Sequence, residues 1–137
     1  MRNGGPSNTG TGMILGDGSP ATGPSQYITA EDNVIVDPGH VGINLAGGDH
    51  ITIRNNKIYS NRDVPSDRPN TVGFAMNHFN YSQDCHSHTV TGNRVFQKNQ
   101  LLSRGFNHVW DTGTCGVTQS GNVFGDSSLN YGIWTLD

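Results

Sequence analysis

Apolar and polar residues alternate in four short segments of the chain, which begin at Ile28, Ile51, His88 and Val117. Each segment has an asparagine at its sixth position and an apolar residue two positions later. Alternation with a period of two residues is typical of β-strands, whose successive side chains point to opposite faces. No stretch combines the period of an amphipathic helix with capping residues. The pattern therefore predicts an all-β protein with little or no helix.

The recurring asparagines are Asn33, Asn56, Asn93 and Asn122, which lie 23, 37 and 29 residues apart. Self-similarity at this period is the mark of a repeat architecture, and the unequal spacing indicates insertions at fixed loops. Asparagine tolerates left-handed backbone at a bend, and its amide can hydrogen-bond to the equivalent amide of the next repeat. We therefore predict a structural asparagine ladder at a bend between two strands.

Segments that begin with glycine, at 12–15, 42–45, 73–76 and 132–136, predict a second strand in each repeat. After Asn93 either 105–108 or 108–110 fits this place, and the retained glycine favours 105–108. Stacked repeats of this kind predict a β-solenoid of about four to five short coils with parallel strands. The residues expected to face its interior are Met13, Leu15, Ile28, Ile35, Ile43, Leu45, Ile51, Ile53, Ile58, Phe74, Met76, Val90, Val95, Val117, Phe124, Ile133 and Trp110.

The segment 42–59, with echoes at 72–96 and 109–124, resembles the right-handed parallel β-helix proteins of the pectate-lyase-like superfamily. The resemblance covers about residues 10–137. It implies contact with polysaccharide outside the cell or on a particle surface, because the superfamily includes polysaccharide lyases, hydrolases and phage tailspikes. The chain departs from complete enzymes of this type, which have more coils, an N-terminal capping helix and a long groove.

The composition sets the class of protein. The 137 residues are expected to form one module, 1–137, with a flexible segment at 1–10, and its start within a repeat favours a piece of a longer chain. Nineteen glycines and 15 asparagines indicate many turns. A net charge of −3 without a basic cluster argues against nucleic acid, and no apolar run is long enough for a membrane span.

Two cysteines precede the last two asparagine segments, at Cys85 and Cys115. Equivalent positions on neighbouring repeats lie within the Cα separation of a disulfide. A Cys85–Cys115 disulfide is expected and would indicate an oxidising compartment. Two reduced, half-buried cysteines are the alternative.

Candidate carbohydrate-binding residues lie at three places. The outward positions of the glycine-led strands offer amides and aromatic rings, the strand ends add polar groups, and the insert at 60–70 adds two arginines. Ordinary solvated strand surface and loop charges are the alternative. The candidates are Asn44, Asn77, His78, Asn107, Trp110, Asp111, Trp134, Arg62 and Arg68.

The stretch 78–88 is rich in histidine, and His86 and His88 would project to the same side of an extended strand. No four-ligand spacing is completed there, so we expect no metal site. We also expect no cofactor, except that Ca²⁺ would suit a lyase that must neutralise a uronate.

The leading hypothesis is non-catalytic. It describes an extracellular, cell-surface or virion-surface β-helix module that contacts polysaccharide or serves as a structural unit, and it assigns no catalytic residue. The alternative is a fragment of a lyase or hydrolase acting on an acidic polysaccharide. Exposed strand edges at the ends of a repeat stack favour a homo-oligomer, or packing against flanking sequence.

Overall fold

The computed structural model describes residues 11–16, 25–36, 38, 41–60, 72–76, 85–97, 109–111 and 116–129. These residues form short strands and one turn of 3₁₀ helix, η1 (Ser127–Leu129), and they contain no α-helix. The prediction of an all-β chain is therefore confirmed for the described part. None of its helical residues forms a segment that is long and apolar enough to cross a membrane.

The described strands form four parallel sheets. Sheet 1 contains β1 (Met13–Leu15), β4 (Val41–Leu45), β8 (Val72–Met76) and β12 (Val109–Asp111). Sheet 2 contains β2 (Thr29–Glu31), β6 (Thr52–Arg54), β10 (His88–Thr91) and β13 (Val117–Ser120). Sheet 3 contains β3 (Val34–Val36), β7 (Lys57–Ser60), β11 (Arg94–Gln97) and β14 (Val123–Phe124). Sheet 4 contains only β5 (Gly48–Asp49) and β9 (Cys85–His86).

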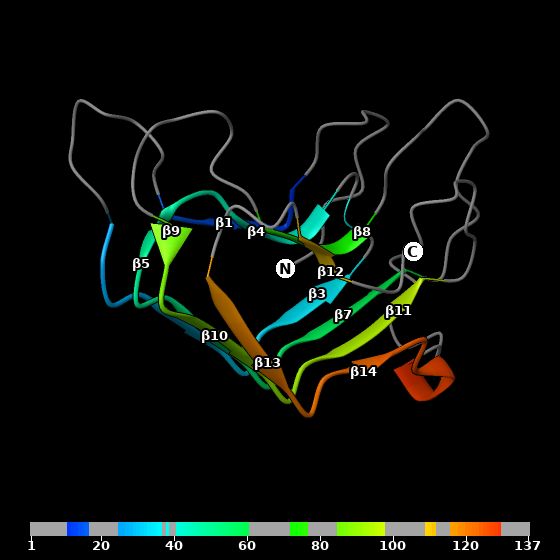
Figure 1. The fold of residues 1–137 in the computed structure, drawn as a ribbon. Coiled ribbons are helices and arrows are strands. Elements are labelled where there is room, and N and C mark those ends of the chain that lie inside the picture. The colour runs from blue at the N-terminus through cyan, green and yellow to red at the C-terminus, as the bar shows by residue number, and fades with distance from the viewer. Residues whose placement is uncertain are drawn as a thin grey trace.

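Strand pairing follows the sequence repeat. In sheet 2 the threonines Thr29, Thr52, Thr89 and Thr118 lie in register on four neighbouring strands. Each strand of a sheet therefore comes from the same place in successive repeats, and neighbours in space are one repeat apart in sequence. Figure 1 shows sheets 2 and 3 meeting at an angle, with sheet 1 across the interior from them.

The main core lies between these sheets. It takes inward side chains from each of sheets 1, 2 and 3, such as Ile43, Ile53 and Ile58, all of which are fully buried. The predicted interior is confirmed for the buried Leu15, Ile35, Ile43, Leu45, Ile51, Ile53, Ile58, Val90 and Val95, and for the partly buried Met13, Ile28 and Val117 that pack against them. The side chains at 74, 76, 110 and 133 lie outside the described part.

Phe124 was expected in the interior, but 36% of its surface is exposed. Its equivalents Ile35, Ile58 and Val95 are completely buried. Phe124 lies on β14, which is the last strand in the order of sheet 3. The expectation failed because an inward direction does not bury a side chain unless a further layer covers it.

The four asparagines of the repeat form a ladder of hydrogen bonds. Asn33 Nδ2 donates to Asn56 Oδ1, Asn56 Nδ2 to Asn93 Oδ1 and Asn93 Nδ2 to Asn122 Oδ1, each over 2.9 Å. Each accepting oxygen also takes the backbone N–H of the preceding asparagine, over 2.9–3.0 Å. Asn56 and Asn93 are fully buried in this ladder, where their amides satisfy buried backbone groups.

The left-handed bend lies one residue before each ladder asparagine. Asp32, Asn55, Gly92 and Gly121 have φ of 54°, 55°, 65° and 62°. The sequence-based interpretation placed this conformation at the ladder asparagine itself and was wrong by one position. The reason is that the ladder residue must direct its own N–H along the stack, so the residue before it turns the chain.

The strand that follows Asn93 in sheet 1 is β12, which pairs with β8 through Val109 and Phe74. The retained glycine had favoured 105–108, and that choice is incorrect. A glycine can be accommodated at this place, but its presence does not favour a strand there. The segment that pairs with β8 is the one that begins at Val109.

Candidate functional site

Most of the predicted carbohydrate-binding residues lie outside the described part of the chain. These are Arg62, Arg68, Asn77, His78, Asn107 and Trp134. For Trp110 and Asp111 the structure gives only their places in β12. Trp110 is in register with Ala75 of β8, and Asp111 with Met76. Trp110 therefore occupies the same register position as Asn44.

Asn44 was expected on an exposed face but is only 5% exposed. All five residues of β4 are buried, and so is Ala46, which follows them. Alternation determines the side of the strand, whereas exposure depends on what packs over that side. Asn44 Oδ1 is buried and accepts no hydrogen bond from the described residues. This position therefore does not provide the open amide surface that the sequence predicted.

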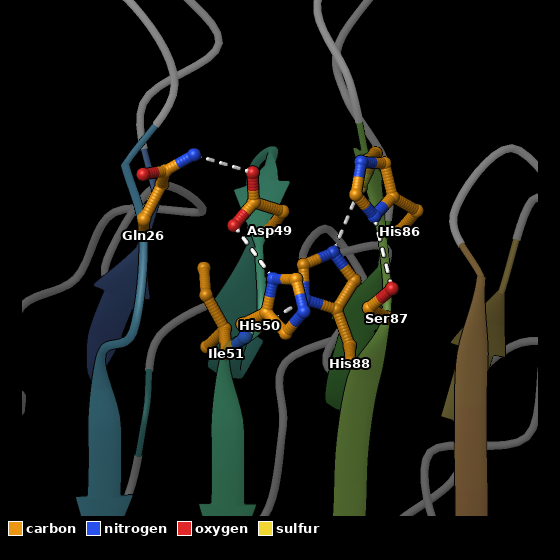
Figure 2. A network of polar contacts seen from close by, with 8 residues as sticks. Gln26, Asp49, His50, Ile51, His86, Ser87 and His88 are labelled. Atoms are coloured by element: carbon orange, nitrogen blue, oxygen red, sulfur yellow. Dashed lines mark hydrogen bonds and ion pairs between the residues drawn. The ribbon is translucent and has the colours of Figure 1, made fainter.

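A different polar cluster lies beside sheet 4, where three successive repeats meet (Figure 2). We call it the histidine patch, and it consists of Gln26, Tyr27, Asp49, His50, His86 and Ser87. Gln26 forms a parallel bridge with Asp49, and Asp49 pairs with His86. The backbone N–H of Asp49 also donates to Ser25 O over 2.9 Å, and that of His50 to His86 O over 3.3 Å. Backbone pairing thus holds side chains that are 23–37 residues apart in the sequence next to each other.

A second left-handed bend shapes this patch. Tyr27, His50 and Ser87 occupy the same place in their repeats and have φ of 56°, 52° and 60°. Because of this bend, the side chains of the residues before and after it point in different directions. His86, before the bend, is exposed, whereas His88, after it, is 1% exposed. The prediction that His86 and His88 project to the same side is therefore wrong, because it assumed an extended chain at Ser87.

Asp49 organises the patch from a nearly buried position. Its Oδ2 accepts a hydrogen bond from Gln26 Nε2 over 2.7 Å, and its Oδ1 lies 2.9 Å from His50 Nδ1. The hydrogen bond with His50, followed by that with Gln26, lowers the pKa of Asp49 although burial opposes this. An ionised carboxylate only accepts, so His50 Nδ1 carries the proton of this hydrogen bond, and none of the described residues hydrogen-bonds to Nε2.

Aromatic rings form the exposed part of the patch. The His50 ring stacks on Tyr27 with centroids 4.9 Å apart and planes 23° apart. The His86 ring meets His50 edge to face at 6.1 Å. Tyr27 is 73% exposed and the His50 side chain 47%. Ser87 Oγ lies 3.0 Å from His86 Nδ1. The patch therefore presents ring faces and hydrogen-bonding groups.

His88 supports the patch from the interior. It occupies the register position of Ile51, one residue before the threonines that pair in sheet 2. His88 Nδ1 accepts the backbone N–H of Ile51 over 3.2 Å, and Nε2 lies 3.5 Å from Cys85 Sγ. Burial lowers the pKa of His88, and His86 and His50 act in the same direction. His88 is thus a neutral core histidine with both ring nitrogens engaged.

Cys85 is buried and disulfide-bonded. Cys115 lies outside the described residues. The Cys85–Cys115 pairing therefore stays a prediction. Within the described ranges no group of three or more histidine, cysteine or acidic side chains is arranged to hold a metal ion.

Sequence reasoning missed Gln26, Tyr27 and His50 as site residues. The signal was present, because aligning the four repeats on their threonines places Tyr27, His50, Ser87 and Gly116 in one column. The residues before them, Gln26, Asp49 and His86, form a second column. The asparagine is the clearer signal because it is identical in all four repeats, whereas the residues in these two columns differ.

Comparisons of the chain with protein-family models, with curated proteins and with solved structures found no match.

Proposed function

We propose that this protein is a right-handed parallel β-helix module of about four to five coils that binds polysaccharide through the histidine patch. Parallel pairing between equivalent strands of successive repeats supports the β-helix. The right hand follows from the strong general preference for right-handed connections between parallel strands of one sheet.

The observation that carries the binding function is the Tyr27–His50 ring stack beside Asp49. A sugar presents hydroxyl groups at its edges and C–H groups on its faces. Exposed aromatic rings can pack against the C–H face of a sugar, and the Tyr27 ring combines an apolar body with a polar hydroxyl. Gln26, His50 Nε2 and Ser87 suit the hydroxyls. Both carboxylate oxygens of Asp49 are hydrogen-bonded within the patch, to Gln26 and His50. A sugar hydroxyl that binds there therefore does not meet an unpaired carboxylate.

Repeats also favour a polymer as the ligand. The patch draws residues from three neighbouring repeats, whose strands lie ~4.8 Å apart. Extended binding surfaces are common on stacked repeats, because variable positions line up along the stack. A chain of sugars could follow this direction, which is why we propose a polysaccharide rather than a single sugar.

An extracellular, cell-surface or virion-surface location agrees with this function. The disulfide at Cys85 supports it, since disulfides persist in oxidising environments. Net charge −3 gives no attraction to the phosphates of nucleic acid.

A polysaccharide lyase or hydrolase is the second candidate, and the Asp49–His50 hydrogen bond is the observation that favours it. A carboxylate that orients an imidazole leaves the other ring nitrogen available as a general base. Under this alternative, incubation with polyuronates produces a double bond detectable by absorbance, or new reducing ends. His50→Gln would abolish that turnover. If the native protein itself shows no turnover of these polysaccharides, the lyase or hydrolase function is excluded.

Binding is tested by screening the chain against a panel of neutral and acidic polysaccharides by calorimetry. Tyr27→Asn keeps a residue that tolerates left-handed backbone and removes the ring. We expect it to weaken binding by about tenfold, the value of one good ring contact. Thr118→Ala, at an exposed position on β13, is the matched control and should bind like the native protein. Equal affinities of the two variants would contradict the assignment of the patch.

A further inference from the structure

Two residues of one repeat, Cys85 and His88, depart from the pattern of the others. Cys85 pairs with Gly48 in sheet 4, and His88 lies in register with Val117 in sheet 2. The His88 side chain is 1% exposed, at a position where the other repeats have isoleucine or valine. Burying an imidazole in place of an aliphatic side chain costs free energy unless its nitrogens find partners. The two exceptions contact each other, which indicates a shared role.

The hydrogen of the His88 ring lies on the nitrogen that faces the sulfur of Cys85. The Ile51 backbone N–H donates to His88 Nδ1 over 3.2 Å, so Nδ1 carries no hydrogen (Figure 2). A neutral imidazole has one N–H, which is therefore at Nε2. Nε2 lies 3.5 Å from Cys85 Sγ. His88 thus presents a hydrogen-bond donor to the sulfur of a disulfide.

Backbone hydrogen bonds hold this pair in place. The Gly116 N–H donates to Cys85 O over 3.0 Å, and the His88 N–H donates to Gly116 O over 2.9 Å. Gly48 also interacts with the His88 ring through its backbone. The donor is therefore pre-organised beside the sulfur. Gly116 directly follows Cys115 in the sequence, which agrees with Cys115 as the expected partner of Cys85.

The position of Cys85 sets the direction in which its disulfide can open. A thiolate attacks one sulfur of a disulfide, and the other sulfur leaves with the electron pair. Cys85 is 8% exposed, so an external thiolate reaches the partner sulfur more readily. A bond then forms between the reductant and the partner sulfur, the S–S bond breaks, and Cys85 Sγ leaves as a thiolate. The second thiol of a dithiol reductant displaces the partner sulfur, and both cysteines end as thiols with protons from the reductant.

The leaving step is where His88 acts. Burial in apolar surroundings disfavours a thiolate. A hydrogen bond from the His88 Nε2–H to the charged sulfur opposes this effect, because bonds to an ionised acceptor are stronger than neutral ones. A stabilised thiolate is also the better leaving group. The contact therefore makes the disulfide easier to reduce than burial alone would allow.

We propose that the disulfide at Cys85 is a redox-sensitive switch, which dithiol reductants open with Cys85 as the leaving sulfur and with His88 as the positioning residue that stabilises it. Cys85 and His86 form β9, which pairs with β5 beside the histidine patch. Reduction removes the covalent anchor of this strand, so the redox state controls how firmly β9 is held. The proposal does not depend on the ligand of the patch.

The test measures how fast dithiothreitol reduces the oxidised full chain at neutral pH, by trapping thiols with N-ethylmaleimide and counting the adducts by mass spectrometry. We expect His88→Val, which copies Val117, to be reduced about tenfold more slowly than the native protein, the effect of losing one hydrogen bond to a charged group. His88→Gln, whose amide can donate, should restore part of the rate. Thr118→Ala, at an exposed position, is the control and should react like the native protein.

A purely structural role of His88 predicts the opposite sign. If the ring only packs, His88→Val leaves reduction unchanged or accelerates it by loosening the segment, and either result would overturn the proposal. The direction is tested in the native protein alone, since glutathione traps the first mixed disulfide. Peptide mapping should place glutathione on the partner cysteine and a free thiol at Cys85. Glutathione on Cys85, or a disulfide that is reduced only after unfolding as seen by circular dichroism, would also overturn the proposal.

Discussion

The asparagine ladder and the histidine patch are both built at left-handed bends, yet they treat the repeat differently. At the ladder every repeat supplies the same residue, and the amides of Asn56 and Asn93 are fully buried. At the patch the equivalent residues Tyr27, His50 and Ser87 all differ, and they are exposed. The ladder satisfies backbone groups of the fold, whereas the patch leaves its hydrogen-bonding groups available to a ligand. Repetition thus indicates structure, and the variable residues at an equivalent bend form the surface for which we propose a binding role.

The largest expected effect comes from breaking the ladder with Asn56→Ala. This removes the acceptor of the Asn33 N–H and the donor to Ala30 O, and leaves buried groups unpaired. Each orphaned group costs about 1–3 kcal/mol, so we expect a loss of roughly 3 kcal/mol or more in the free energy of unfolding. Urea denaturation measures it, and the exposed neighbouring variant Lys57→Ala serves as control. A loss as small as that of the control would show that the ladder is not a major source of stability.

The pH dependence of stability tests the interior support of the patch. Burial lowers the pKa of His88 in the folded protein, so the unfolded chain takes up the proton more readily. Stability from the neutral ring is complete above the unfolded value near 6.5 and falls as pH decreases toward the lowered folded value. One proton gives a slope of at most about 1.4 kcal/mol per pH unit. His88→Val, which copies the equivalent Val117, should reduce the slope measured by denaturation from pH 7 to 5. If the slope is unchanged in this variant, the pH dependence of stability comes from groups other than His88.

A smaller loss is expected from straining the ladder bend with Gly121→Ala. Gly121 has φ of 62°, and an added Cβ would lie 3.8 Å from the Gly92 backbone nitrogen, which is an ordinary contact, so backbone strain is the whole effect. That strain costs about 1 kcal/mol. Gly92→Ala should cost more, because its Cβ would lie 2.6 Å from Asn55 Oδ1. Thermal denaturation of both variants checks the order, and a reversed order would contradict this account of the bend.

The smallest effect on stability is expected from Tyr27→Asn in the patch. Tyr27 is 73% exposed, and exposed substitutions usually change the free energy of unfolding by less than about 0.5 kcal/mol. The same variant is expected to lose polysaccharide affinity. Denaturation and calorimetry on one preparation separate the two quantities. A large loss of stability would mean that the patch, like the ladder, serves the fold.

The sequence alone predicted the repeat, the parallel strands and most of the main core, because alternation and a fixed asparagine are local signals that recur once per repeat. It did not predict the second, smaller core cluster of Val36, Tyr59 and Leu129. Register followed as well, since the threonines and asparagines pair with their own equivalents. Among the strands that the structure describes, β12 was misplaced, where a long insertion left two segments that both fit the pattern.

The site depended on tertiary structure. Whether Asn44 is exposed depends on what covers its side of sheet 1, and no pattern along β4 records that. The opposite directions of His86 and His88 depend on one left-handed residue, Ser87. Asp49, His50 and Tyr27 became neighbours of His86 only through pairing across repeats. The sequence by itself determined which positions repeat, because that is a property of the chain. The tertiary structure decided which variable positions meet and remain exposed, because contact and coverage arise between segments that are distant in the chain.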